Sequence, residues 1–403
     1  MPIMPDPLLP YEAVQLEEAT LELDESKRLL DIQGPLPRAW AGRLRRDLEA
    51  EAVAASTRME GVNVTLEEVR RILAGESPGD VDPEDRDLVA GYRNAMSFVL
   101  RQADDPAFAW DRGLIVGLHD RAMAGRFSLG AGRVRTDAPV FIVNRLTRQQ
   151  VFLPPPGEEV DSLLDRATGR MRAGHPHPAI AAAWIHVAVA AIHPFQDGNG
   201  RSARILASLA MYRGGFKRPE FTSLEEWWGR HLETYYGLFG CLGVEFDAEA
   251  DVTPFILGHI DAQLHQVRAL DIRGRTERQI WTAVEEAAED AHLDRRLANA
   301  LWDAFFGRDV TAGYYRSLAD VSPATATNDL AAAVSSGHLR PEGERRGRRY
   351  RAGERLYLAV AQSLSIPNVG PIETARDVIV SEIGRRLTEF GAVGLSRPPP
   401  ARD

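Results

Sequence analysis

A loop rich in glycine and charge carries the residues whose types and spacing best suit phosphate chemistry. It reads His193-Pro-Phe-Gln-Asp-Gly-Asn-Gly-Arg-Ser-Ala-Arg204. Gly198 and Gly200 let successive backbone N–H groups converge, and the next helix adds its positive N-terminal end at the same point. Arg201 and Arg204 share one face of that helix, where they can clamp phosphate oxygens. The loop therefore predicts a cradle for a polyphosphate.

Two more side chains of this loop suit a reaction at a phosphate. Asp197 supplies the hard oxygen ligand that Mg²⁺ on a nucleotide triphosphate requires. His193 is the one group in the stretch whose ordinary pKa suits it to accept a proton near neutral pH. Taken alone, Asp-Gly-Asn-Gly is typical of a plain turn, and a histidine after an apolar helix is typical of a capping or core residue. The functional interpretation therefore depends on the whole loop.

Helices must position this loop, because hydrophobic residues recur with helical spacing along most of the chain. The predicted helices cover residues 36–59, 69–73, 85–100, 111–123, 160–171, 179–192 and 201–212. The apolar run 178–192 is shorter than the ~20 residues that span a bilayer, so it predicts a buried core helix. Two β-type runs, 140–143 and 150–153, precede Pro154-Pro-Pro156 and predict a β-hairpin. We expect a mostly α protein with one hairpin beside its helical core.

The composition bounds the class of protein. The chain has 403 residues, of which 44% are hydrophobic and 26% charged, and a net charge of −10. These values predict a globular chain of two or three domains at ~150 residues each and exclude collagen, coiled-coil rods and disulfide scaffolds. Cys241, the single cysteine, favours a reducing cytoplasm and excludes Cys-rich zinc sites. We expect neither a signal peptide nor a membrane partner.

The loop resembles the motif of the Fic (filamentation induced by cAMP) proteins, His-x-Phe-x-(Asp/Glu)-Gly-Asn-Gly-Arg-x-x-Arg. Its fixed positions are matched here by His193, Phe195, Asp197, Gly198, Asn199, Gly200, Arg201 and Arg204. Residues 130–136 and the hairpin after them look like the flap of that family, and 212–216 closes the core in a similar way. The resemblance covers roughly residues 37–245 and implies a Fic-type helical core with a β-hairpin flap.

This resemblance implies transfer of AMP from ATP to a Tyr, Thr or Ser hydroxyl of a target protein that the sequence does not identify. His193 would deprotonate the hydroxyl, and Asp197 would hold Mg²⁺. Five other motif positions would form the ATP site: Gly198, Asn199, Gly200, Arg201 and Arg204. Of these, Asn199 would steady either the phosphates or the loop itself. Gly198 favours AMP transfer, since a bulkier residue replaces it in the related Doc toxins, which transfer the γ-phosphate.

The flap would hold the target chain by strand addition, which gives main-chain affinity with little side-chain specificity. The residues implied in this role are Val140, Phe141, Ile142 and Val143. A plain structural hairpin with no partner is the alternative.

Upstream, Ser56-Thr-Arg-Met-Glu60-Gly61 resembles the inhibitory motif of the same family. Gly61 suits the position after a helix end, so Glu60 lies on the last turn, where the helix dipole disfavours an anion by ~0.3–1 kcal/mol. The resemblance implies that Arg204 offsets this cost and is thereby denied to the γ-phosphate. Ser56, Glu60 and Gly61 would then inhibit the enzyme within one chain. An exposed glutamate at a helix end is the alternative.

The C-terminal third predicts a helix, a turn and a second helix over residues 309–335, with Ser322 as N-cap and Pro323 at the first helical position. The Arg-rich run 340–351 predicts a hairpin, and the whole resembles a winged helix. Binding to DNA would use Thr325, Thr327 and Asn328 in the major groove and Arg345, Arg346, Arg348 and Arg349 on phosphates. The negative net charge and Asp329 disfavour DNA, which leaves dimerisation or target docking as the alternative.

The predicted organisation runs from an N-terminal arm to a disordered tail. Its parts are 1–36, the arm; 37–105, a helical region with the inhibitory helix; 106–250, the Fic catalytic core; 251–290, connecting helices; 291–362, the winged-helix domain; and 363–403, a helix and tail. Two other functions stay open: a nucleotide-sensing winged-helix regulator, and removal of AMP by water that Glu60 activates. A homo-oligomer is compatible with the sequence.

Overall fold

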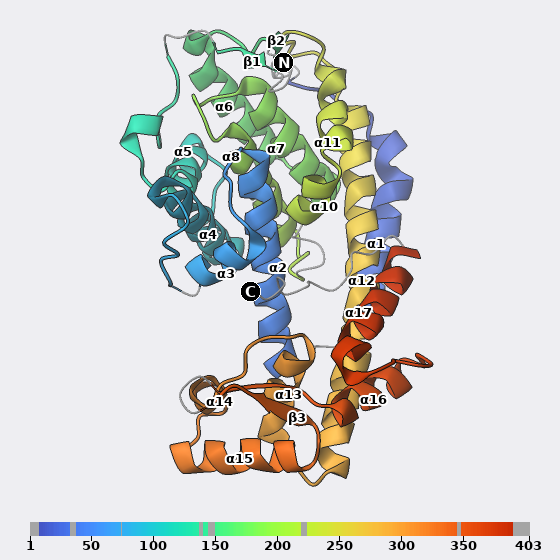
Figure 1. Ribbon diagram of the computed structural model, residues 1–403. Helices are drawn as coiled ribbons and strands as arrows, with labels where there is room; N and C mark the ends of the chain where they lie inside the picture. The colour runs from blue at the N-terminus through green and yellow to red at the C-terminus, as the bar shows by residue number, and fades with distance from the viewer. Residues whose placement is uncertain are drawn as a thin grey trace. The chain divides into compact units, whose positions relative to one another are not determined.

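The computed structural model describes residues 8–32, 38–73, 75–136, 140–143, 150–218, 224–344 and 348–389. The chain divides into two compact units, Met1–Val267 and Arg268–Asp403, and the boundary falls within helix α12 (Thr253–Asp290). Helices dominate both units, so the mostly α prediction is confirmed (Figure 1). The predicted disordered tail, 396–403, lies outside the described residues.

The first unit is helical apart from one small hairpin. Its elements before α12 are η1 (Ala13–Leu16), α1 (Glu17–Ile32), α2 (Arg38–Met59), α3 (Leu66–Leu73), α4 (Pro83–Ala103), α5 (Arg112–Ala122), η2 (Phe127–Leu129), β1 (Ile142–Val143), β2 (Gln150–Phe152), α6 (Gly157–Ala173), α7 (Pro178–Ile192), α8 (Asn199–Arg213), α10 (Leu224–Arg230), α11 (Leu232–Leu238) and η3 (Phe239–Leu242). The helices predicted from hydrophobic spacing are all present, with ends that differ by a few residues.

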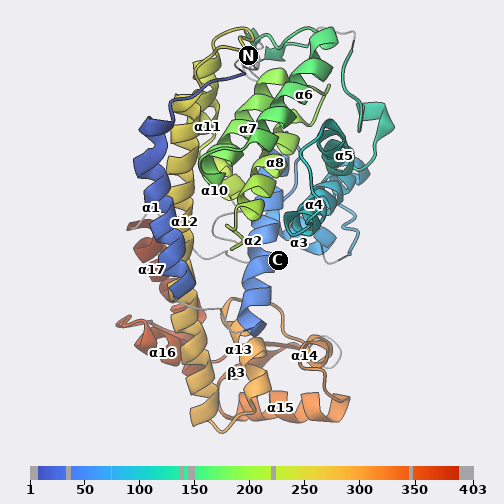
Figure 2. The same cartoon turned by 180° about the vertical axis from the view of Figure 1, so that it is seen from behind.

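Helix α7 is the centre of the first unit. Nearly all of its residues are buried, as a helix that is apolar on every side requires. Helices α6 and α8 pack against it, and α4 and α5 pack on α8 (Figures 1 and 2). Trp184 is fully buried and donates its indole N–H to the Leu9 carbonyl at 3.0 Å. The predicted core helix is thus confirmed, and no helix of the described ranges combines the length and apolar character that crossing a membrane needs.

The predicted hairpin is present. Strands β1 and β2 are antiparallel, with Ile142 opposite Phe152. After β2, Leu153 donates its N–H to the Val244 carbonyl and accepts from the Phe246 N–H, both at 2.9 Å. This second pairing fixes the end of β2 to the core. Strand β1 is left with β2 as its one neighbour among the described strands.

The second unit has its own core and a second hairpin. After α12 come η4 (Arg295–Leu297), α13 (Ala298–Phe305), α14 (Ala312–Ala319), α15 (Pro323–Ser335), β3 (Leu339–Glu342), β4 (Arg349–Ala352), α16 (Glu354–Ser363) and α17 (Ile372–Glu389). Ser322 caps α15 by accepting from the Thr325 N–H at 3.1 Å, and Pro323 opens the helix as predicted. The sequence order helix, helix, hairpin is therefore present, and its assignment as a winged helix stays a prediction.

Asp329, which counts against DNA binding, and two of the groups assigned to DNA in that prediction bond within their own unit. Asp329 accepts from Arg296 at 2.7 and 3.0 Å and from the Tyr315 hydroxyl at 2.7 Å. Thr327 donates to the Pro323 carbonyl, and Arg349 pairs with Asp309. The predicted phosphate contacts Arg345 and Arg346 lie outside the described residues.

If α7 is the centre of the core, truncating its largest side chain must destabilise the first unit. We expect Trp184→Ala to lower the free energy of unfolding by about 3–5 kcal/mol, since it removes a fully buried ring and an indole hydrogen bond. Urea denaturation measures the change. Leu21→Ala, at an exposed position on α1, serves as control and should cost less than about 0.5 kcal/mol. Equal losses in the two variants would contradict this placement of the core.

Candidate functional site

The glycine-rich loop joins the C-terminus of α7 to the N-terminus of α8 at the centre of the first unit. His193 ends α7 with a left-handed backbone, φ 49°, and Gly198 precedes α8 with φ 74°. The Asn199 side chain donates to the Phe195 carbonyl at 2.8 Å and accepts from the Phe195 N–H at 2.9 Å. In this structure the side chain of Asn199 therefore closes the loop through its two hydrogen bonds to the Phe195 backbone.

Gly198 is required for close packing as well as for its backbone angle. A Cβ at this position would lie 2.6 Å from the Met123 sulfur and 3.2 Å from the His119 Nε2. The His119 ring stacks flat on Phe195, with centroids 3.6 Å apart. Its Nδ1 accepts from the Gly132 N–H and its Nε2 donates to the Asp197 carbonyl, each at 3.0 Å. His119 therefore holds the loop in place by stacking on Phe195 and by its hydrogen bond to the Asp197 carbonyl.

His193 has the properties of a base. Burial, with a smaller contribution from the Arg135 charge, lowers its pKa to about 4 against the opposing effects of the Ala190 carbonyl, Glu60 and Asp197. The ring is therefore neutral at pH 7. Its Nδ1 lies 3.4 Å from the Ala190 carbonyl, so a proton on Nδ1 leaves Nε2 as the acceptor.

Arg204 is buried, and each nitrogen of its guanidinium donates a hydrogen bond. It donates to the Ser56 hydroxyl at 2.9 Å, the Ser56 carbonyl at 3.1 Å, the Tyr235 hydroxyl at 3.3 Å and Glu60 Oε1 at 2.7 Å. Burial disfavours its charge, but Tyr235 and Glu60 outweigh this and raise the pKa of Arg204. The structure therefore brings together the predicted inhibitory residues and the last arginine of the loop motif.

Glu60 also reaches the start of α8. Helix α2 ends at Met59 and Gly61 follows with φ 90°, which turns the chain there. A side chain at position 200 would collide with the Glu60 carboxylate. The absence of a side chain at Gly200 therefore leaves the space that the carboxylate occupies. An anion at this point benefits from the positive end of α8 and from Arg204. Glu60 thus occupies the position that the sequence predicts for a phosphate.

Arg201 is the second buried cation of the loop. Its Nη2 donates to Asp197 Oδ2 at 3.2 Å. Its Nε and Nη1 are buried and have no hydrogen-bond partner within the described part of the chain. Buried donors without partners are costly, and oxygens of an anionic ligand would satisfy them.

Asp197 is the residue on which a metal ion would depend. Its side chain is 52% exposed, and Oδ1 accepts from the Gly198 N–H at 2.6 Å. Across the ranges that the structure describes, no three His, Cys, Asp or Glu side chains converge as a metal site. Mg²⁺ at nucleotide sites is commonly held by one or two carboxylates, waters and the phosphates themselves. Asp197 therefore fits a metal that arrives with a nucleotide.

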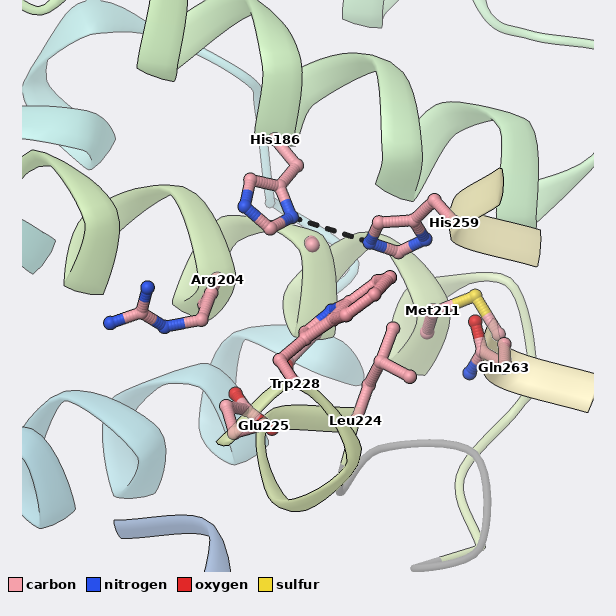
Figure 3. Close-up of a pocket in the computed structure, with 10 residues that line it drawn as sticks. His186, Arg204, Met211, Leu224, Glu225, Trp228, His259 and Gln263 are labelled. Atoms are coloured by element: carbon pink, nitrogen blue, oxygen red, sulfur yellow. Dashed lines mark hydrogen bonds between the residues drawn. The ribbon is translucent and has the colours of Figure 1, made fainter. Parts of the chain in front are cut away.

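A polar chain runs behind Arg204. The Tyr235 hydroxyl accepts from Arg204, so it donates to His186 Nε2 at 3.0 Å, and His186 Nδ1 donates to His259 Nε2 at 3.3 Å (Figure 3). These histidines and Trp228 border a cavity of about 20 Å³, which has room for about one water molecule. The arrangement holds Arg204 through Nη1, whereas Glu60 bonds to Nη2.

Sequence reasoning missed His119, Arg135 and Tyr235. His119 lies on the buried face of α5 and gives no signal beyond that of a core residue. Lys27 and Lys217 are the only lysines among the 48 basic residues, and the others are arginines. The residue type of Arg135 therefore does not single it out in the sequence. Of the predicted flap residues, Phe141 is half exposed, Val140 and Ile142 are partly buried, and the Val143 side chain lies outside the described part.

Comparison with known proteins identifies the domain that this loop belongs to. Residues 109–211 match the model of the Fic/DOC family. The chain contains a Fic domain. It is 29% identical over 213 residues to "Protein adenylyltransferase Fic" of Nematostella vectensis, and 31% identical over 166 residues to "Protein adenylyltransferase fic-1" of Caenorhabditis elegans. These matches cover 50% and 39% of this chain, but 46% and 30% of the relatives, so the chain spans half or less of their length.

Solved structures share the fold. A Fic family protein from Desulfovibrio desulfuricans G20 superposes with a TM-score of 0.56 at 22% identity, over 87% of this chain and 98% of that one. A fragment of Fic-1 from C. elegans gives 0.52 at 21% identity, over 66% and 75% of the two chains. At these identities the likeness concerns the fold, and the chemistry must be argued from the site.

The buried histidines predict a stability that falls in acid. Burial lowers the pKa of His119 to about 4 and that of His259 to about 3, and places the pKa of His186 well below its ordinary value. As pH falls from about 6.5 toward 4, these histidines become protonated in the unfolded state but stay neutral in the folded state. The unfolded state then binds more protons, so stability is present above pH 6.5 and is lost as pH falls.

Urea unfolding at about pH 7 and about pH 5 measures this loss. His259→Gln should reduce the loss between the two pH values, because position 259 no longer titrates. His265→Gln, at an exposed position of α12, should leave the loss unchanged. Equal pH dependence of wild type and His259→Gln would contradict the account.

Proposed function

We propose that this chain is a protein adenylyltransferase, which transfers AMP from ATP to a hydroxyl of a target protein. The observation that carries the proposal is a neutral, partly buried base, His193, on the same tight loop as Arg201, a buried guanidinium whose Nε and Nη1 have no hydrogen-bond partner among the described residues. That loop ends at the positive N-terminus of α8. A base beside an anion cradle suits nucleotidyl transfer, and the relatives named above as adenylyltransferases support it.

The reaction follows from these positions. His193 Nε2 accepts the proton of the target hydroxyl, and the oxygen attacks the α-phosphorus of ATP. The bond from the α-phosphorus to the bridging oxygen breaks, and pyrophosphate leaves. Arg201 and the backbone N–H groups at the start of α8 bind the phosphate oxygens. Mg²⁺, which Asp197 would hold, neutralises charge on the phosphates when it is bound.

Gly198 supports AMP transfer over phosphate transfer. Met123 and His119 fill the space where its side chain would be, so a larger residue would displace the loop. In the family that this chain resembles, a glycine at this position accompanies AMP transfer, whereas the Doc toxins, which transfer the γ-phosphate, carry a bulkier residue.

Glu60 acts as an internal inhibitor in this proposal. Its carboxylate takes Arg204 and the start of α8, which the γ-phosphate needs. Two anions repel each other strongly in a site of low dielectric, so ATP must displace Glu60 or bind in an unproductive pose. When Glu60 is absent, Ser56 and Tyr235 still hold Arg204, so the cation stays in position for phosphate.

Strand β1 and the second unit would bind the target protein. Strand β1, with its half-exposed Phe141, is the edge to which a target strand would add. The second unit suits protein docking better than DNA, because Asp329, Thr327 and Arg349 already bond within it.

Removing the inhibitor should activate transfer. We expect Glu60→Gly to increase labelling of protein from α-labelled ATP and Mg²⁺ by at least about tenfold, because loss of one charge-assisted hydrogen bond corresponds to ~1.5–3 kcal/mol. Glu60→Gly/His193→Ala should abolish the label, since the base is gone. Parallel reactions with γ-labelled ATP should leave protein unlabelled.

Glu76→Gly is the matched control, because it removes an exposed carboxylate outside the helices and should leave the rate unchanged. An unchanged rate in Glu60→Gly would remove the inhibitory role. Loss of AMP release from modified protein in Glu60→Gly, with no gain in labelling, would instead support AMP removal by Glu60-activated water.

A further inference from the structure

We propose that Arg135 is a positioning residue that ties both ends of the flap hairpin to the catalytic base. The inference deepens the proposed function and rests on it for the role of His193. It starts from a buried arginine outside the loop motif, whose side-chain bonds all go to main-chain carbonyls.

The guanidinium of Arg135 joins two separate segments. Its Nε donates to the His193 carbonyl at 2.7 Å, and its Nη2 donates to the Pro155 carbonyl at 2.7 Å and the Ile192 carbonyl at 3.1 Å. Its own backbone N–H donates to the Pro194 carbonyl at 2.9 Å. One residue thus holds the end of α7, the base and the segment after strand β2.

These acceptors explain why a cation can be buried here. Arg135 is 5% exposed, and burial lowers its pKa. The last carbonyls of a helix lack partners within the helix and carry the negative end of its dipole, which favours a cation. His193 follows with a left-handed backbone that non-glycine residues seldom adopt, and a bonded carbonyl holds it in that conformation. The guanidinium therefore fixes the direction in which the base leaves α7.

The same residue closes the neck of the flap. Thr136, the next residue, lies so close to Gly157 that a Cβ there would collide with the Thr136 carbonyl. The chain enters the flap beside Thr136 and leaves it at Pro155, and Arg135 bonds across these two ends. The flap cannot shift relative to His193 without breaking a bond of Arg135. His119, which links the Gly132 N–H to the Asp197 carbonyl, gives a second tie, between the segment before the flap and the catalytic loop.

The tie matters for the target more than for ATP. A strand that adds to β1 takes its position from the flap, whereas its hydroxyl must meet His193. Displacement by about 1 Å can reduce transfer about 100-fold. Arg135 makes no bond to the residues that would hold phosphate, so its loss should change the transfer step and leave nucleotide affinity unchanged.

Arg135→Gln and Arg135→Lys in the Glu60→Gly background test the proposal. The control is Arg133→Gln, at an exposed position of the same segment. Binding of ATP is measured by calorimetry, transfer by labelling of protein from α-labelled ATP, and local stability by amide hydrogen exchange. We expect Arg135→Gln to reduce transfer about 100-fold with unchanged ATP affinity. Exchange should rise together at residues 130–136, 153–157 and 193–198, and Arg133→Gln should match its parent.

Arg135→Lys keeps the cation but loses the forked donors, so it should fall between parent and Gln and serves as the test if Gln does not fold. Transfer within about twofold of the parent, or a loss that tracks an equal loss of ATP affinity, would overturn the proposal. If Glu60→Gly itself labels nothing, the proposed function fails, but hydrogen exchange still decides the tie. Unchanged exchange at 153–157 and 193–198 in both Arg135 variants would refute it.

Discussion

The site of this protein depends on which anion pairs with the buried guanidinium of Arg204. Arg204 is 3% exposed, and its guanidinium lies beside Gly200 at the start of α8, where the helix dipole adds to its charge. Glu60 supplies the compensating charge in this structure. Leaving such a cation without an anion would be strongly unfavourable, so one must replace another. This requirement connects the end of α2 to the loop. In the proposed function, it makes inhibition by Glu60 and binding of the γ-phosphate alternatives at Arg204.

Other residues of the first unit hold Arg204 in position independently of the anion that it binds. Ser56 and Tyr235 hold the Arg204 side chain through bonds that do not involve Glu60. The Tyr235 hydroxyl is itself held by its hydrogen bond to His186. The cation is therefore in place whether Glu60 is present or absent. Preorganisation of this kind means that little rearrangement is needed when phosphate takes the place of carboxylate. His193 stays neutral because burial lowers its pKa, so in the proposed reaction it can accept a proton once ATP is bound.

Much of this could be predicted from the sequence. The apolar run of α7, the β-type runs of the flap and the Ser322-Pro323 start of α15 indicate their structures locally. The resemblance of two separated motifs also predicted that Glu60 and Arg204 would meet. The supports His119, Arg135 and Tyr235 could not be predicted, because each acts through main-chain atoms or buried polar contacts that exist only after packing. An isolated histidine, arginine or tyrosine carries no periodicity or spacing that shows which carbonyl it will meet.

Calorimetric titration of ATP and Mg²⁺ into wild type and Glu60→Gln tests the central claim most directly. Gln keeps the size of the side chain and removes its charge, so the comparison isolates the competition for Arg204. The account predicts that the amide variant binds ATP about 10- to 100-fold more tightly, since a charge-assisted bond of ~1.5–3 kcal/mol is no longer displaced. Equal affinities in the two proteins would show that Glu60 and the nucleotide do not compete, and would contradict the account.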